Sequence, residues 1–197
     1  MNKNYNLKLL GYRSFYLGIF LLPSSAFLGA IFLLLALLFN DRKINKFYFR
    51  DPWNYPFFIA GLLMILGCFQ AYSSSLSWIG LFNWLPFFWG FWAFQAYLET
   101  KDLRRRCALF FVAGTVPVVI TGFGQLWFNW QGPWELLNGL IVWFIDSGGE
   151  PEGRLSGLFS YANIAGAWLA FVWPFALAAL LQPNVKIFRR VLAFSIV

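Results

Sequence analysis

Long apolar runs separated by short polar connections dominate this sequence. The runs cover about residues 9–39, 57–72, 78–98, 107–128 and 157–181. A helix that crosses a bilayer needs roughly 20 apolar residues, and the first run is long enough to be broken into two helices. The pattern therefore predicts an all-α, polytopic integral membrane protein with about six to seven transmembrane helices.

The first run contains Pro23-Ser24-Ser25, a combination that bends or breaks a helix. It is either one bent span or a hairpin of two short ones. The connection after it holds Arg42, Lys43, Lys46 and Arg50 and is as basic as the N-terminal tail. Basic connections favour the cytoplasmic side. If both the N-terminal tail and this connection lie in the cytoplasm, the chain must cross the membrane an even number of times between them, which favours the hairpin.

The polar connection over residues 129–156 is the longest, and it is acidic, as an external loop often is. Within residues 134–145, Trp134 and Trp143 are suited to anchor the segment at the interface, and four apolar side chains recur at helical spacing: Leu137, Leu140, Ile141 and Phe144. This spacing predicts a short amphipathic helix lying at the membrane interface. Gly148-Gly149 follows as a hinge, so we expect the helix to form a movable cover.

The last apolar run begins at Val191 and has reached only Val197 when the sequence stops. A run of that length is too short to cross a bilayer. We therefore expect residues 1–197 to form a single transmembrane helical domain that is the N-terminal part of a longer protein.

Composition supports the membrane class and removes other classes. Residues are 60% hydrophobic and 12% charged, whereas average soluble domains carry about 25% charged residues. The net charge of +7 lies in short connections between apolar runs rather than on a basic face, so we expect no nucleic-acid partner. The chain has no histidine, and Cys68 and Cys107 fall in different runs, so we expect no metal site and no cofactor.

Arg154 stands apart from the other basic residues. All but one of the fifteen lysines and arginines fall in the tail or in connections assigned to the cytoplasm, and Arg154 is the exception. A helix beginning near Gly157 or Ser160 would place its free N–H groups beside Arg154, and together they would favour an anion such as phosphate. Asn163 would lie about one turn inside that helix.

A simpler interpretation of Arg154 stays open. It is a flanking residue that pairs with Glu150 or Glu152, while Asn163 bonds to a neighbouring helix. The isolated position of Arg154 on the external side favours the anion site, because a cation that opposes the orientation rule needs a reason.

The run Arg154-x-x-Gly157-x-Phe159-x-x-x-Asn163, followed by small residues and a membrane helix, resembles the signature of the O-antigen ligase and polymerase family. The aromatic segments before it resemble cyanobacterial members, so the resemblance covers most of the chain. It implies a metal-independent glycosyltransferase of polysaccharide or lipopolysaccharide biosynthesis. Such an enzyme moves a glycan from a polyprenyl diphosphate carrier to a lipid or glycan acceptor, on the external (periplasmic) face of the plasma, or inner, membrane.

The resemblance also implies roles for individual residues. Arg154 matches the arginine of the motif, which makes it the expected catalytic, diphosphate-binding residue. Asn163 is expected to orient Arg154 or to contact substrate, Gly157 to allow close backbone approach, and Tyr161 to contribute to substrate binding. Family members usually need a histidine and a second arginine on a large external loop nearer the C-terminus, and this chain has neither. The acceptor-activating base is therefore unassigned, with only three nearby carboxylates to consider: Asp146, Glu150 and Glu152.

Two other functions stay open. The same superfamily includes cyanobacterial proteins linked to inorganic-carbon accumulation, and an external arginine beside a helix N-terminus would also suit bicarbonate. The other open function is that of a non-catalytic partner in a membrane assembly. Transport predicts polar groups along a path at mid-membrane, and these runs contain almost none, which favours an enzyme with a lipid-linked substrate. The sequence does not distinguish ligation from polymerisation.

Overall fold

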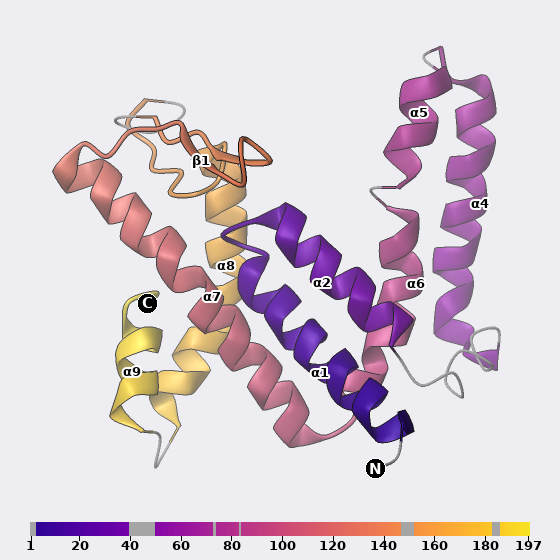
Figure 1. Ribbon diagram of the computed structural model, residues 1–197, viewed down its shortest axis with the longest axis horizontal. Coiled ribbons are helices and arrows are strands. Elements are labelled where there is room, and N and C mark those ends of the chain that lie inside the picture. The colour runs from indigo at the N-terminus through magenta and orange to yellow at the C-terminus, as the bar shows by residue number, and fades with distance from the viewer. Residues whose placement is uncertain (1–2, 40–49, 73, 83, 147–151, 183–185) are drawn as a thin grey trace. The chain divides into compact units, whose positions relative to one another are not determined.

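A computed structural model describes residues 3–39, 50–72, 74–82, 84–146, 152–182 and 186–197. The described chain is predominantly helical, with one small two-stranded sheet that the all-α expectation did not include (Figure 1). The elements in chain order are α1 (Lys3–Leu21), α2 (Ala26–Leu38), η2 (Pro52–Asn54), α4 (Tyr55–Gln70), α5 (Ser74–Leu81), α6 (Leu85–Ala93), η3 (Phe94–Tyr97), α7 (Lys101–Phe128), β1 (Trp134–Leu136), β2 (Ile141–Trp143), α8 (Ala162–Leu181) and α9 (Ile187–Phe194).

Three helices of the described chain are long and apolar enough to cross a membrane. They are η2 together with α4 (Pro52–Gln70), α7 and α8. This agrees with the expected class of a membrane protein with several membrane-spanning helices.

The first apolar run is a tight helical hairpin, as predicted, rather than one bent helix, but neither of its helices is among the three described helices that are long and apolar enough to cross a membrane. The N–H of Ser24 and the N–H of Ser25 both donate to the carbonyl of Leu21, at 3.0 and 2.7 Å, which closes α1. The Ser25 hydroxyl then accepts from Leu28 N at 3.4 Å and caps the start of α2. A Cβ added to Gly29 would lie 2.7 Å from Leu22 Cα, so the turn needs a residue without a side chain there.

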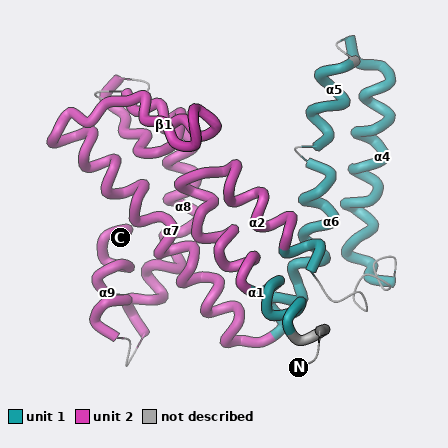
Figure 2. The backbone as a smooth tube through the Cα atoms, in the orientation of Figure 1, with its two compact units in different colours: residues 1–12, 36–99 teal, residues 13–35, 100–197 magenta. Residues whose placement is uncertain are grey.

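The chain divides into two compact units (Figure 2). Unit 1 comprises residues 1–12 and 36–99, and unit 2 comprises residues 13–35 and 100–197. Each unit has its own buried cluster.

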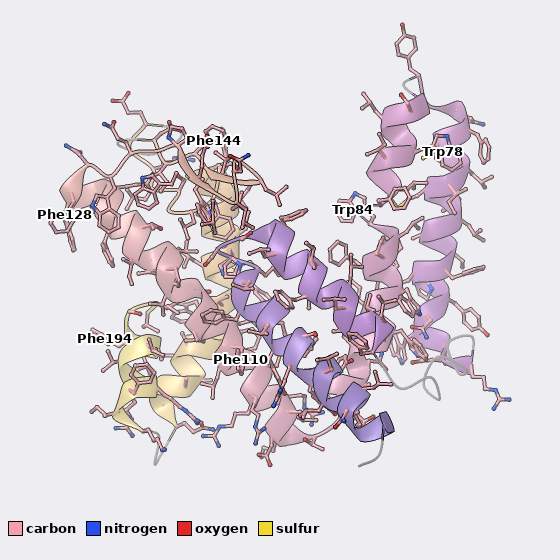
Figure 3. All side chains as sticks on the ribbon, in the orientation of Figure 1. Trp78, Trp84, Phe110, Phe128, Phe144 and Phe194 are labelled. Atoms are coloured by element: carbon pink, nitrogen blue, oxygen red, sulfur yellow. The ribbon has the colours of Figure 1, made fainter. Side chains whose placement is uncertain are left out.

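Unit 1 is held together by aromatic side chains. Its cluster consists of Leu37, Trp92 and Ala93. The hydroxyl of Tyr97, which is buried, donates to the carbonyl of Ala36 at 2.7 Å. On α5, Trp78 lies beside α4 (Figure 3), and its ring meets that of Phe69 edge to face at 5.1 Å.

The expected continuous span over residues 78–98 is wrong. Instead, α5 ends at Leu81, α6 begins at Leu85 and η3 follows it. Pro86 occupies the first turn of α6, where its missing N–H costs nothing, although the same ring would interrupt a helix arriving from the N-terminal side. A hydrogen bond from Trp84 N to the Leu81 carbonyl, at 3.1 Å, links the end of α5 to the residue before α6.

Unit 2 is built on the antiparallel pair α7 and α8. Small and β-branched side chains fill the core between them and α9: Val112, Val172, Ala176, Ala179 and Ala193. Small residues let helix backbones approach closely in a membrane protein, where the lipid supplies no hydrophobic force between helices. Phe110, on α7, stacks on Tyr16 of α1 at 4.9 Å (Figure 3).

Helix α7 begins earlier than predicted. The hydroxyl of Thr100 accepts from Leu103 N at 3.3 Å and forms the N-cap, so the helix starts at Lys101 rather than Cys107. The basic segment Lys101–Arg106 therefore forms the first turns of the helix instead of a connecting turn. In the same way, α9 begins at Ile187, so Arg189 and Arg190 precede Val191 within one helix.

The interfacial helix predicted over residues 134–145 is wrong. This segment is an antiparallel β-hairpin in which Trp134 pairs with Trp143 and Leu136 with Ile141. Leu137, Asn138 and Gly139 all have positive φ, at 54°, 58° and 84°. Asn-Gly favours the left-handed conformation that such turns require, and this preference overrides the helical spacing of the leucines. The Trp143 indole N–H also donates to the Ser24 carbonyl, so the segment is bonded to the α1–α2 turn and does not form the expected movable helical cover.

Candidate functional site

Arg154 lies in the segment that joins the β1–β2 hairpin to α8. The helix begins just after Ser160, the later of the two expected starts, and not at Gly157. Tyr161, with φ −152° and ψ 135°, is extended and is the N-cap, so α8 starts at Ala162. Before it, Phe159 N donates to the Ser156 carbonyl at 3.0 Å and forms a separate turn. Asn163 consequently lies in the first turn of α8 rather than one turn inside it.

The structure brings Arg154 and Asn163 together. The Arg154 Nη1 donates to Asn163 Oδ1 at 3.5 Å, and both side chains are exposed. This is a long hydrogen bond, so it orients the guanidinium without holding it tightly. In the described part of the chain, no ion pair joins Arg154 to Glu152 and no bond joins Asn163 to a neighbouring helix. Glu150, the other partner considered, lies outside the described residues.

The first backbone N–H groups of α8 lie beside this pair. Tyr161 makes no side-chain cap bond, and the first helical bonds run from Ile164 N and Ala165 N to the Tyr161 carbonyl, at 3.1 and 3.2 Å. A helix start of this kind presents N–H donors and the positive end of the helix dipole. Combined with the exposed guanidinium, it forms an arrangement suited to an anion.

Gln125, on α7, holds the segment that carries Arg154. Its side chain is 1% exposed. The Nε2 group donates to the Asp146 carbonyl at 3.0 Å and to Ser156 Oγ at 3.2 Å. The Oε1 atom accepts from Ser156 N at 3.2 Å and from Gly157 N at 2.7 Å.

The sequence analysis missed Gln125. The available signal was a lone amide inside an otherwise apolar run, because polar groups in membrane-spanning segments are costly and usually have a partner.

Gly157 is buried against α7. It has φ +59°, and an added Cβ would lie 2.6 Å from the Val118 carbonyl oxygen. Only glycine combines that conformation with so close an approach. Phe159, another residue of the motif, packs against Trp168 of α8, with the centroids of the two rings 6.1 Å apart. These two residues of the motif thus shape the segment that presents Arg154.

The remaining candidates that the structure describes are all exposed. Tyr161 is 40% exposed beside the start of α8. The side chains of Asp146 and Glu152 are exposed. In the described ranges, no three His, Cys, Asp or Glu side chains are grouped so as to hold a metal ion, and Cys68 and Cys107 are free thiols.

Comparison of the chain with protein-family models, with curated proteins and with solved structures finds no match.

Proposed function

We propose that this protein is a membrane glycosyltransferase of the O-antigen ligase and polymerase type. It takes a glycan from a polyprenyl diphosphate carrier and transfers it to a lipid or glycan acceptor at the external face of the plasma membrane, within a bundle of about six to seven transmembrane helices. The observation that carries the proposal is the contact between the exposed Arg154 and Asn163 at the N-terminus of α8.

The proposed chemistry relies on stabilising the leaving group. Transfer of the glycan leaves a diphosphate, whose charge develops as the glycosidic bond breaks. The guanidinium of Arg154 presents a planar fork that matches phosphate oxygens, and the first N–H groups of α8 add fixed dipoles. Asn163 keeps the fork directed toward the helix start, and Tyr161 borders the same position.

The charge distribution within unit 2 supports an external site. Because α7 and α8 are antiparallel, the start of α8 lies at the C-terminal end of α7, far from the basic first turns of α7. Helix α7 has 28 residues and is roughly 42 Å long at 1.5 Å per residue, more than the roughly 30 Å of a hydrocarbon core. The basic end of α7 favours the cytoplasm, so Arg154 belongs on the opposite side.

The polar groups buried in α7 support an enzyme over a transporter. The hydroxyl of Thr115 donates to the Phe111 carbonyl at 2.8 Å, and that of Thr121 donates to the Pro117 carbonyl at 2.9 Å. The side chain of Gln125 forms hydrogen bonds with Asp146 and with Gly157, on either side of Arg154. These groups bond within the protein, so they do not serve as ligands along a path for bicarbonate.

The test is glycan transfer from a purified lipid-linked donor by the full-length protein in liposomes. We expect Arg154→Ala to lower kcat/KM by about tenfold to a hundredfold, because losing a charge-assisted hydrogen bond costs roughly 1.5–3 kcal/mol. Arg154→Lys should recover little of it, since lysine keeps the charge but loses the planar fork. Asn163→Ala should have a smaller effect than Arg154→Ala.

Arg105→Ala is the matched control, because Arg105 is an exposed arginine in the first turns of α7, at the other end of the helix pair. Its transfer rate should equal that of the parent at the same protein level. Parent-rate transfer by Arg154→Ala would contradict the proposal. Loss of bicarbonate uptake in that variant, with transfer intact, would assign the site to transport instead.

A further inference from the structure

One buried amide bonds to the chain on both sides of Arg154. Gln125 Nε2 donates to the carbonyl of Asp146, eight residues before Arg154, and to the hydroxyl of Ser156, two residues after it. We infer that Gln125 is a positioning residue that holds Arg154 at the N-terminus of α8. The catalytic part of this inference rests on the function proposed above.

The contacts of Arg154 itself do not fix its position. Its side chain is exposed, and its hydrogen bond in the described chain is the 3.5 Å contact with Asn163. Its neighbour Ser156, by contrast, is 1% exposed and joined to Gln125 through both its backbone N–H and its hydroxyl. The location of the guanidinium therefore follows from where Gln125 anchors Ser156 and Gly157.

The arrangement requires glutamine. Both N–H donors of the amide have an acceptor, and the oxygen has two backbone donors, so the side chain is fully satisfied. Rotating the amide by 180° would bring its NH₂ group against the N–H groups of Ser156 and Gly157. Glutamate would set a carboxylate oxygen against the Asp146 carbonyl and bury a charge. Leucine would leave two backbone N–H groups without a partner.

The main consequence concerns turnover. A misplacement of about 1 Å at a catalytic group can cost on the order of a hundredfold in rate. We expect Gln125→Leu to lower kcat/KM for glycan transfer by about tenfold to a hundredfold, although Gln125 itself touches neither donor nor acceptor. Ser156→Ala, which removes one of the four bonds, should have a smaller effect and retain the packing.

Thr121→Val is the matched control. Thr121 precedes Gln125 by about one turn of α7, is also buried, and its hydroxyl donates to carbonyls of its own helix, those of Pro117 and Val118, at 2.9 Å. This variant keeps the side-chain shape and removes no bond to the segment that carries Arg154. Its transfer rate should equal that of the parent.

A double-mutant comparison separates positioning from general damage. If Gln125 acts through Arg154, Gln125→Leu should lower transfer in the parent but lower it no further in the Arg154→Ala variant. An equal loss in both backgrounds would overturn the inference, because it would mean that Gln125 acts independently of Arg154.

A second readout does not depend on activity. In the full-length protein lacking Cys68 and Cys107, a nitroxide on Glu152→Cys reports the motion of the segment by electron paramagnetic resonance. Gln125→Leu and, more weakly, Ser156→Ala should increase the mobility of the label, whereas Thr121→Val should not. Unchanged mobility in Gln125→Leu would overturn the inference. If Arg154→Ala transfers glycan normally, the glycosyltransferase proposal fails, and the label still decides whether Gln125 fixes the segment.

Discussion

Helices α7 and α4 both contain a stretch that is long and apolar enough to cross a membrane, but they differ in how much of that stretch is buried. In α7, 44% of that stretch is buried within the protein, against 17% for the stretch that includes α4. An apolar helix can therefore be either a scaffold for other elements or a surface for lipid, and its hydropathy does not say which.

The difference lies in small and polar residues on one face of α7. Thr115, Val118, Thr121 and Gln125 recur at intervals of three or four and are all buried, as expected for a single helical stripe. The corresponding stretch of α4 buries Gly61 and Cys68, while large apolar side chains on that helix are exposed: Ile59, Leu62, Leu63, Leu66 and Phe69. The face of α7 that carries hydrogen-bonding groups is buried, whereas the face of α4 that carries large apolar side chains is exposed.

The largest change in stability is expected at Gly114, where α7 lies against the backbone of α1. A Cβ on Gly114 would lie 2.3 Å from the Phe20 carbonyl oxygen, and backbone cannot move aside as a side chain can. Gly114→Ala should destabilise the protein by about 1–3 kcal/mol. Gly67→Ala, on α4, meets nothing within 4 Å and should change stability by less than about 0.5 kcal/mol.

Both variants are measured as the midpoint of thermal unfolding in detergent, by size-exclusion chromatography after heating. Gly122→Ala, with open space around it on α7, is the control within the same helix. Equal shifts for Gly114→Ala and Gly67→Ala would remove the distinction between the two helices.

A smaller difference is expected for apolar truncation. Val172, on α8, is 0% exposed and packs with Val112 of α7, whereas Leu66 on α4 is 60% exposed. Val172→Ala loses packing contacts that lipid cannot replace and should cost about 1 kcal/mol. Leu66→Ala removes more atoms but should cost under about 0.5 kcal/mol. Reversible unfolding in mixed micelles measures both, and a greater loss for Leu66→Ala would show that α4 packs against protein.

The smallest effect concerns the hydrogen bond between the two helices. The Trp168 indole N–H donates to Thr115 Oγ1 at 2.8 Å. Interhelical bonds of this kind average roughly 0.6 kcal/mol in membrane proteins. Thr115→Val, Trp168→Phe and the double variant should give a coupling free energy of about that size in the same unfolding assay. A coupling near zero would mean that packing alone joins α7 and α8.

Several features follow from the sequence alone. Apolar run length identifies the membrane class, since each residue contributes to hydropathy independently of the fold. Pro23 and the serines after it predict a bend or break in the first apolar run, because backbone geometry acts locally, and the basic segments on both sides of that run favour the hairpin. The motif predicts that Arg154 and Asn163 belong together, and their nine-residue separation is short enough for one turn and one helix start to bring them into contact.

Other features depend on packing between distant segments. The helical spacing over residues 134–145 gives way to a hairpin, in which the Asn138-Gly139 turn, strand pairing and the bond from Trp143 to Ser24 act together. The start of α8 at Ala162 follows from an extended Tyr161, not from the first apolar residue. Gln125 bonds to Ser156, 31 residues away. A buried amide needs partners, but which partners it finds is decided only when α7 and the following segment pack together.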